Sequence, residues 1–220
     1  VAAHAGGGID EATGAIVPPL HMATTFIRDP DNQWFGVTVR ARTVMRSTAR
    51  VPEDAIDSYE DLGDPRFKGK VCLRSGTSEY NVSFVADRLA KDGDEATRAL
   101  LEKWMANEPE ILGSDVDVLQ AIKAGRCDIG LTNSYYLGRE LEKDPGFPVA
   151  PVWVDQDGRG THVNISGIGI VKGAEHRVNA VKLLEYLVQP EQQASFSKVN
   201  HEFAVDEGIE PTEEIARFGD

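Results

Sequence analysis

Two tyrosines, Tyr135 and Tyr136, stand side by side in the stretch NSYYLG, where a short apolar run meets a charged, helix-like segment. Neighbouring side chains on a regular helix or strand point in different directions, so at least one of the two does more than fill a core. A phenol, with an unperturbed pKa of about 10, is a poor general base at neutral pH. A hard, highly charged cation can displace the proton of a phenol when it binds. Ferric iron is such a cation, and three phenolates would balance its three positive charges.

The segments around these tyrosines alternate between predicted strands and predicted helices. The strand-like runs are WFGVTVRARTVM, KVCLRSG, CDIGLT, FPVAPVWV and HVNISGIGIV. This alternation predicts an α/β fold with a largely parallel sheet. Ligands of such sheets bind beyond the carboxyl ends of strands, beside helix N-termini. Tyr135 and Tyr136 follow one predicted strand and Tyr80 follows another, so we expect all three phenols at one crevice. There are two alternatives. The tyrosines could pack at the core boundary with hydrogen-bonded hydroxyls, or they could form a stacking surface for a small organic ligand.

Two further patterns are suited to anions. The turn RSGTS, Arg74 to Ser78, opens a predicted helix and resembles an anion-binding nest, although a plain capping turn has the same composition. Arg40 and Arg42 lie on one face of a predicted strand, where either could hold a carboxylate or an inorganic anion. Phosphate-binding P-loops, GxSxG, HExxH and paired CxxC motifs are missing from the sequence, and we expect no enzymatic activity.

Composition narrows the class of protein. The chain has 220 residues, 41% of them hydrophobic and 27% charged, as in soluble globular proteins. Its net charge of -13 argues against nucleic acid or an anionic membrane surface as a partner. No signal peptide is visible at Val1, so an exported protein would be represented by its mature or an incomplete form. The two cysteines, Cys72 and Cys127, fit either one disulfide or two buried thiols.

Several long stretches of the chain occur in the same order in a known family. They are DNQWFGVTVRARTV, SYEDLGDPRFKGKVCLRSGTSEYNVS, AIKAGRCDIGLTNSYYLG, GRGTHVNISG, NAVKLLEYL and NHEFAVDEGIEPT. Over about residues 29–220 the chain resembles the periplasmic ferric-ion-binding proteins of bacterial ABC iron importers. The resemblance implies a periplasmic-binding-protein-like (flytrap) α/β fold, a periplasmic location, and delivery of iron to an ABC transporter permease.

The resemblance also implies roles for particular residues. Tyr80, Tyr135 and Tyr136 resemble the iron-ligating phenolates of the family. Arg42 resembles the arginine that holds carbonate or another synergistic anion, next to the turn formed by Ser75, Gly76, Thr77 and Ser78. Cys72 and Cys127 occupy positions where related proteins also carry cysteines, which favours a disulfide between them. The implied cofactor is Fe(3+).

The resemblance is incomplete at the N-terminus. Related proteins carry a long additional segment before DNQWFG, so we expect a truncated first lobe. Residues 1–32 instead resemble the N-terminal arm of pyridoxal-phosphate enzymes of cysteine and methionine metabolism. Because no lysine stands in a Schiff-base context, we expect no pyridoxal phosphate. The expected division is an arm (1–32), an iron-carrying α/β lobe with hinge strands (33–155), and a remnant of the other lobe with C-terminal helices (156–220).

Other functions remain open at this point. The chain would also fit a receptor for a non-metal anion or small solute, or a truncated, fused chain without activity. The strand HVNISGIGIV would normally pair with strands of the first lobe. We therefore expect an exposed sheet edge there, which either the N-terminal arm covers or a second copy of the chain binds.

Overall fold

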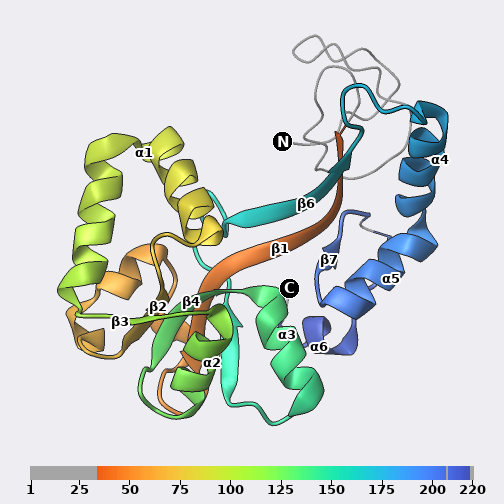
Figure 1. Ribbon diagram of the computed structural model, residues 1–220. Coiled ribbons are helices and arrows are strands. Elements are labelled where there is room, and N and C mark those ends of the chain that lie inside the picture. The colour runs from red at the N-terminus through yellow and green to blue at the C-terminus, as the bar shows by residue number, and fades with distance from the viewer. Residues whose placement is uncertain (1–33, 207, 219–220) are drawn as a thin grey trace. The chain divides into compact units, whose positions relative to one another are not determined.

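The computed structural model describes residues 34–206 and 208–218 (Figure 1). The strands are β1 (Trp34–Ser47), β2 (Val71–Arg74), β3 (Glu110–Leu112), β4 (Ile129–Asn133), β5 (Val149–Val152), β6 (Val163–Gly169) and β7 (Phe203–Ala204). The helices are α1 (Glu79–Ala106), α2 (Asp115–Lys123), α3 (Ser134–Lys143), α4 (Arg177–Leu187), α5 (Pro190–Asn200) and α6 (Glu213–Ala216), with three short 3-10 turns, η1 (Glu53–Ala55), η2 (Tyr59–Gly63) and η3 (Pro65–Phe67). The predicted α/β class is confirmed.

The chain divides into two compact units. Of the described residues, the first comprises 34–40, 165–206 and 208–218, and the second comprises Ala41–Asn164. The strands β1 and β6 pass from one unit into the other. The expected N-terminal arm, residues 1–32, lies outside the described residues. The expected lobe boundaries at 32 and 155 stay a prediction.

The sheet of the second unit has the strand order β3-β2-β4-β1-β5. β2 runs parallel to β3 and β4, whereas β1 runs antiparallel to both β4 and β5. The expectation of a largely parallel sheet therefore holds for four of these strands and is wrong for β1. The reason is the connection from β1 to β2: the short turns η1, η2 and η3 return the chain at the same end of the sheet, so these two strands run in opposite directions.

The central position of β1 also overrides its sequence pattern. Alternating apolar and polar residues predicted a strand with one solvent-facing side. Residues 41–47 are instead buried on both sides of the strand. Because β4 and β5 flank this part of β1, even its arginines are buried, and each needs an acceptor within the protein.

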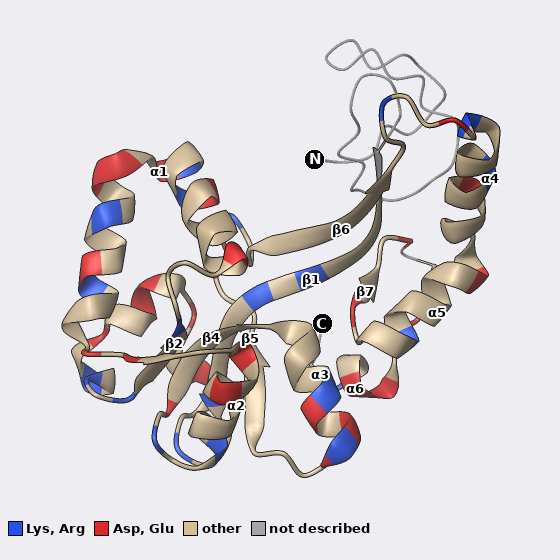
Figure 2. Ribbon diagram, in the orientation of Figure 1, with Lys and Arg blue, Asp and Glu red and all other residues tan. Residues whose placement is uncertain are grey.

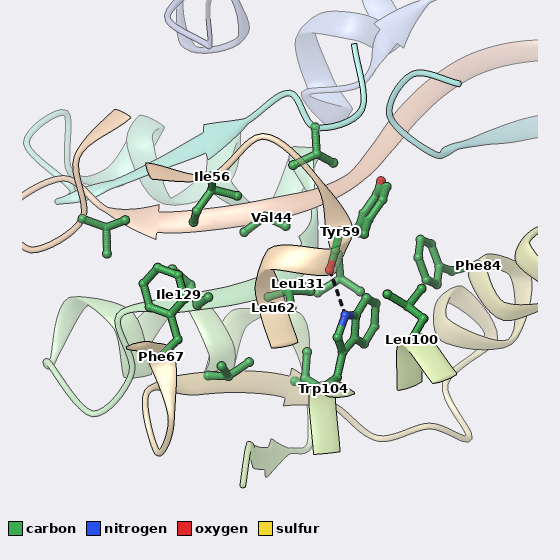
Figure 3. Close-up of a cluster of buried hydrophobic side chains, with 14 residues drawn as sticks. Val44, Ile56, Tyr59, Leu62, Phe67, Phe84, Leu100, Trp104, Ile129 and Leu131 are labelled. Carbon is green, nitrogen blue, oxygen red and sulfur yellow. Dashed lines mark hydrogen bonds between the residues drawn. The ribbon is translucent and has the colours of Figure 1, made fainter. Parts of the chain in front are cut away.

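The main hydrophobic core lies beneath α1 (Figure 3). The Phe84 ring packs between Tyr59 and Trp104, with ring centroids 4.8 and 5.6 Å away. The Trp104 indole N–H donates to the Tyr59 carbonyl over 2.8 Å, the dashed line in Figure 3. Burying such rings contributes strongly to stability, and the hydrogen bond fixes their orientation.

Helix α1 behaves as two helices joined at Gly93. In the sequence, YNVSFVADRLAKDG has helical spacing and Gly93 can end such a helix before a second one begins. In the structure Gly93 has the non-helical angles φ 80° and ψ 173°. Only glycine adopts this conformation without strain. The spacing of Leu100, Leu101, Trp104 and Met105 in the sequence predicts one apolar face for the second half. This is correct for Leu100 and Trp104 but wrong for Met105, which is 55% exposed.

Figure 2 shows acidic and basic segments alternating along α1, so the negative net charge is not gathered on this helix.

The first unit is built on the N-terminal part of β1. Thr38 and Val39 pair antiparallel with β7, and the Thr38 hydroxyl donates to the Glu202 carboxylate. β6 pairs with β1, and no other described strand pairs with β6. The apolar face that the sequence spacing predicts for α4 is only partly buried: Leu184 is buried, whereas Val178 is 70% exposed.

Among the described residues, no helix has the length and apolarity needed to cross a bilayer.

Candidate metal centre

The three candidate tyrosines lie at two neighbouring strand-to-helix corners of the second unit. β2 leads through a short turn into α1, which carries Tyr80, and β4 leads directly into α3, which carries Tyr135 and Tyr136. β2 and β4 are adjacent and parallel, with Cys72 opposite Gly130. Their carboxyl ends therefore share one edge of the sheet, and the phenolic oxygens of Tyr80 and Tyr135 lie 3.2 Å apart. The structure thus brings Tyr80 and Tyr135 together, and a shared ligand crevice at this edge stays a prediction.

Tyr136 joins the same cluster. Its ring lies 4.1 Å from the ring of Tyr135, centroid to centroid, at an interplanar angle of 33°. The expectation that neighbouring tyrosines diverge is wrong for this pair. Both follow Ser134, the first residue of α3, and side chains of this length can lean together from one helical turn. Tyr135 is 6% exposed and Tyr136 is half-buried, so the cluster is open on one side.

The surroundings keep the phenols protonated in the absence of a metal. Burial, together with hydrogen bonds to the Tyr136 and Tyr80 phenols, raises the pKa of Tyr135 well above its usual range. Burial also raises the pKa of Tyr136. A phenol in this site therefore loses its proton only to a strongly bound cation.

Three guanidinium groups, those of Arg139, Arg74 and Arg42, lie over the phenol rings. Arg139, one turn further along α3, lies 4.9 Å from the Tyr135 ring centroid and 5.8 Å from that of Tyr136. Arg74, at the end of β2, lies 5.2 Å from the ring centroid of Tyr80. Positive charges at this distance interact favourably with aromatic ring faces. They compensate part of the negative charge that three phenolates would bring.

Arg42 lies behind this cluster and is completely buried. One of its terminal nitrogens donates to Asp115 and to Asn133, both over 3.0 Å. Its Nε and its other terminal nitrogen donate to the Asn81 side-chain oxygen over 2.9 and 2.6 Å. Protein acceptors thus surround the guanidinium. An anion would contact Arg42 directly only by replacing one of them.

Asp115 connects two arginines, a feature that sequence reasoning missed. Its Oδ1 accepts from Arg42 and its Oδ2 accepts from Arg74, each over 3.0 Å, and its side chain is fully buried. Burial lowers the pKa of Arg42 and Asp115 opposes this effect; both arginines remain charged. The group of three therefore carries one surplus positive charge. In the sequence, Asp115 shows only as an acidic residue directly after the helix cap Ser114. Acidic residues are common in the first turn of a helix because they interact favourably with its dipole.

Arg40 belongs to the other unit and has different partners. It donates to the Ser166 hydroxyl over 2.6 Å and lies 3.9 Å from the Glu202 carboxylate. The sequence indicated that Arg40 or Arg42 could hold a carboxylate. In the structure each pairs with a carboxylate of the protein, and only Arg42 does so near the tyrosines.

The turn from Ser75 to Ser78 closes on itself. The hydroxyls of Ser75 and Thr77 lie 2.9 Å apart, and the Thr77 N–H donates to the Ser75 hydroxyl over 3.3 Å. Gly76 is exposed, with open space where a side chain would stand. The Ser78 hydroxyl is buried and has no hydrogen-bond partner in the structure. A buried polar group without a partner is costly, and a bound anion is one group that would satisfy it.

A disulfide lies below the tyrosine corners. It joins Cys72 in β2 to Cys127, which precedes β4, with the Cα atoms 5.8 Å apart and a sequence separation of 55. Burial of both cysteines shields the bond from reductants. It holds together the two strands whose ends carry the tyrosines.

Comparison with known proteins places the chain in a family. The profile of bacterial extracellular solute-binding proteins matches residues 9–217. The chain belongs to this family. The match begins within residues 1–32, and nothing in the comparisons supports a relation of that segment to pyridoxal-phosphate enzymes.

Relatives of this solute-binding protein are named for iron. It is 40% identical to iron uptake protein A1 of Synechocystis over 204 residues, covering 89% of this chain and 56% of the relative. It is similar to the structure of a Trichodesmium protein in complex with iron and citrate ligands, with a TM-score of 0.83, 37% identity, and coverage of 88% of this chain and 64% of that one.

A further similar structure is the ferric iron-binding protein A of Mannheimia haemolytica in an open conformation. The TM-score is 0.78 at 42% identity, and the match covers 88% of this chain and 63% of that one. These similarities confirm the expected periplasmic-binding-protein-like α/β fold. The chain spans little more than half the length of the curated relatives it matches.

Proposed function

We propose that this chain binds ferric iron through the phenolates of Tyr80, Tyr135 and Tyr136. The convergence of their side chains supports this proposal most directly, because two of the phenolic oxygens lie 3.2 Å apart and the third phenol packs against the second. Oxygens this close can share one metal ion as ligands. Hard oxygen donors suit ferric iron, and three phenolates match its charge.

The names of the relatives point to the same metal. Proteins similar to this chain are named for iron uptake or ferric iron binding, and one of the similar structures contains iron and citrate. Because this chain spans only part of their length, residues outside it can add ligands in a longer protein. Our proposal concerns the three phenols that this chain supplies.

An anion completes the proposed site. We place it beside the turn Ser75–Ser78, where Arg74 is the outer guanidinium and Arg42 contributes its charge from behind. The surplus positive charge of the Arg42, Asp115 and Arg74 group favours an anion at this point. The unpartnered Ser78 hydroxyl adds a potential donor. Carbonate and carboxylates such as citrate both have the required charge and oxygen atoms.

The role in the cell follows from the family. We propose that the protein captures iron in the periplasm and delivers it to the permease of an ABC transporter, without catalysing a reaction and without binding nucleic acid. Self-association through the side of β6 that no described strand pairs with, or through the N-terminal arm, remains part of the proposal. Both would be detected by measuring the oligomeric state of the protein with and without iron.

The visible absorption of the protein tests the iron proposal. Iron-free protein is mixed with ferric citrate at neutral pH in the presence of bicarbonate. Electron transfer from tyrosinate to iron gives a coloured complex, and the double variant Tyr135→Phe, Tyr136→Phe should stay colourless. Tyr186→Phe is the matched control, because Tyr186 lies on α4 and is exposed. A wild-type protein without colour would contradict the proposal and would leave the receptor for a non-metal anion as the better hypothesis.

A further inference from the structure

A cavity lies in the same unit as the phenols and has Arg74 in its lining. It has a volume of about 530 Å³, within the range typical of small-molecule sites. The two halves of α1 form its sides and Ile111 of β3 closes one end. Its lining is almost entirely apolar: Leu73, Val82, Phe84, Val85, Ala86, Leu89, Leu101, Trp104, Met105, Ile111 and Leu131, with Arg74, Gly76 and Asn81 at one end.

The rim of this cavity exposes large apolar side chains. Val82, Leu89, Met105 and Ile111 are between 42% and 55% exposed. Scattered apolar residues on a surface need no explanation, but a contiguous group around a cavity marks a binding site. The rings of Phe84 and Trp104, stacked at 25°, also contribute to the lining. Both rings are buried, at 1% and 4% exposure, so the partly exposed apolar side chains of the rim would make most of the contacts with an aromatic ligand.

The polar end of the cavity selects for negative charge. Arg74 is the charged residue in the lining, and no acidic residue lines the cavity. The Asn81 amide is already engaged, because its nitrogen donates to the carbonyls of Arg74 and Ser75 over 2.9 and 3.0 Å. Arg74 uses one nitrogen for Asp115, and its partly exposed side chain retains other N–H groups that could donate to a ligand.

We propose that this cavity binds aromatic carboxylates, with the carboxylate on Arg74 and the ring between the two halves of α1. Charge complementarity at Arg74 excludes cations, and the apolar lining excludes small hydrated anions. The inference does not rest on iron binding, because it requires only the arrangement of α1, β2 and β3. It gives this protein a second ligand, whose carboxylate would share Arg74 with the anion proposed for the iron site.

Calorimetric titration of the iron-free full chain with 2-naphthoate tests the proposal. We expect one binding site per chain. The neutral alcohol 2-naphthalenemethanol has the same rings and should bind at least about 10-fold more weakly, because a charge-assisted hydrogen bond is lost. Absence of naphthoate binding at millimolar concentration, or equal binding of the alcohol, would overturn the proposal.

Variants at the rim locate the site. Leu89→Glu places a negative charge at the mouth of the cavity and should weaken naphthoate binding by about 10-fold or more, whereas Leu89→Gln should weaken it much less. Val178→Glu is the control for the added charge, because this exposed residue of α4 does not line the cavity. The ferric colour of Leu89→Glu should remain, which separates this test from that of iron binding.

An unchanged affinity in Leu89→Glu would show that naphthoate binds elsewhere and would contradict the assignment. Sedimentation of the wild-type protein and of Leu89→Glu measures the oligomeric state and so tests whether a second copy of the chain occupies the cavity. If the wild-type chain associates with itself and Leu89→Glu dissociates it, the cavity is an interface between copies, and the small-molecule proposal is wrong.

Discussion

The phenolic oxygens of Tyr80 and Tyr135 lie 3.2 Å apart although 55 residues separate them in sequence. The pairing of β2 with β4 brings them together, since each tyrosine stands just beyond the end of one of these parallel strands. The geometry of the site thus depends on the register of two short strands. Perturbing that register should change the site without touching a tyrosine.

The binding of iron should release protons from the phenols. Burial raises the pKa values of Tyr135 and Tyr136, so both are protonated near neutral pH and each must lose its proton to become a ligand. Affinity should therefore rise with pH and fall on acidification. Proton release on adding ferric citrate, measured in weak buffer, should be smaller by about one per iron in Tyr135→Phe than in wild type. Equal release by the two proteins would rule out Tyr135 as a ligand.

Replacing Asp115 should destabilise the protein strongly. Asp115→Asn leaves Arg42 and Arg74 without their shared carboxylate, and Arg42 is fully buried. We expect a loss of about 3–5 kcal/mol in the free energy of unfolding, measured by urea denaturation. Asp117→Asn is the control on the same helix; Asp117 is exposed and should cost about 1 kcal/mol or less. Similar losses for the two variants would show that the buried network contributes little.

A single methyl group at Gly130 should disturb the strands beneath the tyrosines. A Cβ there would stand 2.5 Å from Val118 Cγ1 and 2.8 Å from the Cys72 carbonyl oxygen, too close for any real contact. Gly130→Ala should cost about 1–3 kcal/mol of stability and weaken the ferric colour, because β4 must shift. Gly158→Ala meets its nearest atom at 3.7 Å and should leave both properties unchanged. Full stability in Gly130→Ala would contradict the packing described for β2 and β4.

The disulfide is open to a direct measurement. Under denaturing conditions, reduction should increase the mass of the protein by two hydrogen atoms, as expected for the Cys72–Cys127 bond. Loss of the bond should lower the free energy of unfolding by about 2–4 kcal/mol, chiefly by freeing the unfolded chain. In a Cys72→Ala, Cys127→Ala double variant, reductant should alter neither mass nor stability. A wild-type protein whose mass does not change would show two free thiols.

Local sequence patterns predicted the parts of this site well. Helical periodicity located α1 and α3, and Gly93 marked the break within α1. Short apolar runs located β2 and β4, so the sequence placed Tyr80, Tyr135 and Tyr136 just after strands. Such predictions succeed because periodicity and turn chemistry depend on residues that are neighbours in the chain.

The tertiary structure decided how those parts combine. The direction of β1, the exposure of Met105, and the contact between the Tyr135 and Tyr136 rings all differ from expectation. Asp115 binds Arg42 across 73 residues of sequence, a pairing with no local pattern to reveal it. By itself the sequence indicated that Tyr80, Tyr135 and Tyr136 follow strands. Strand order and buried ion pairs arise from packing between distant segments, and only the folded chain shows which carboxylate meets which arginine.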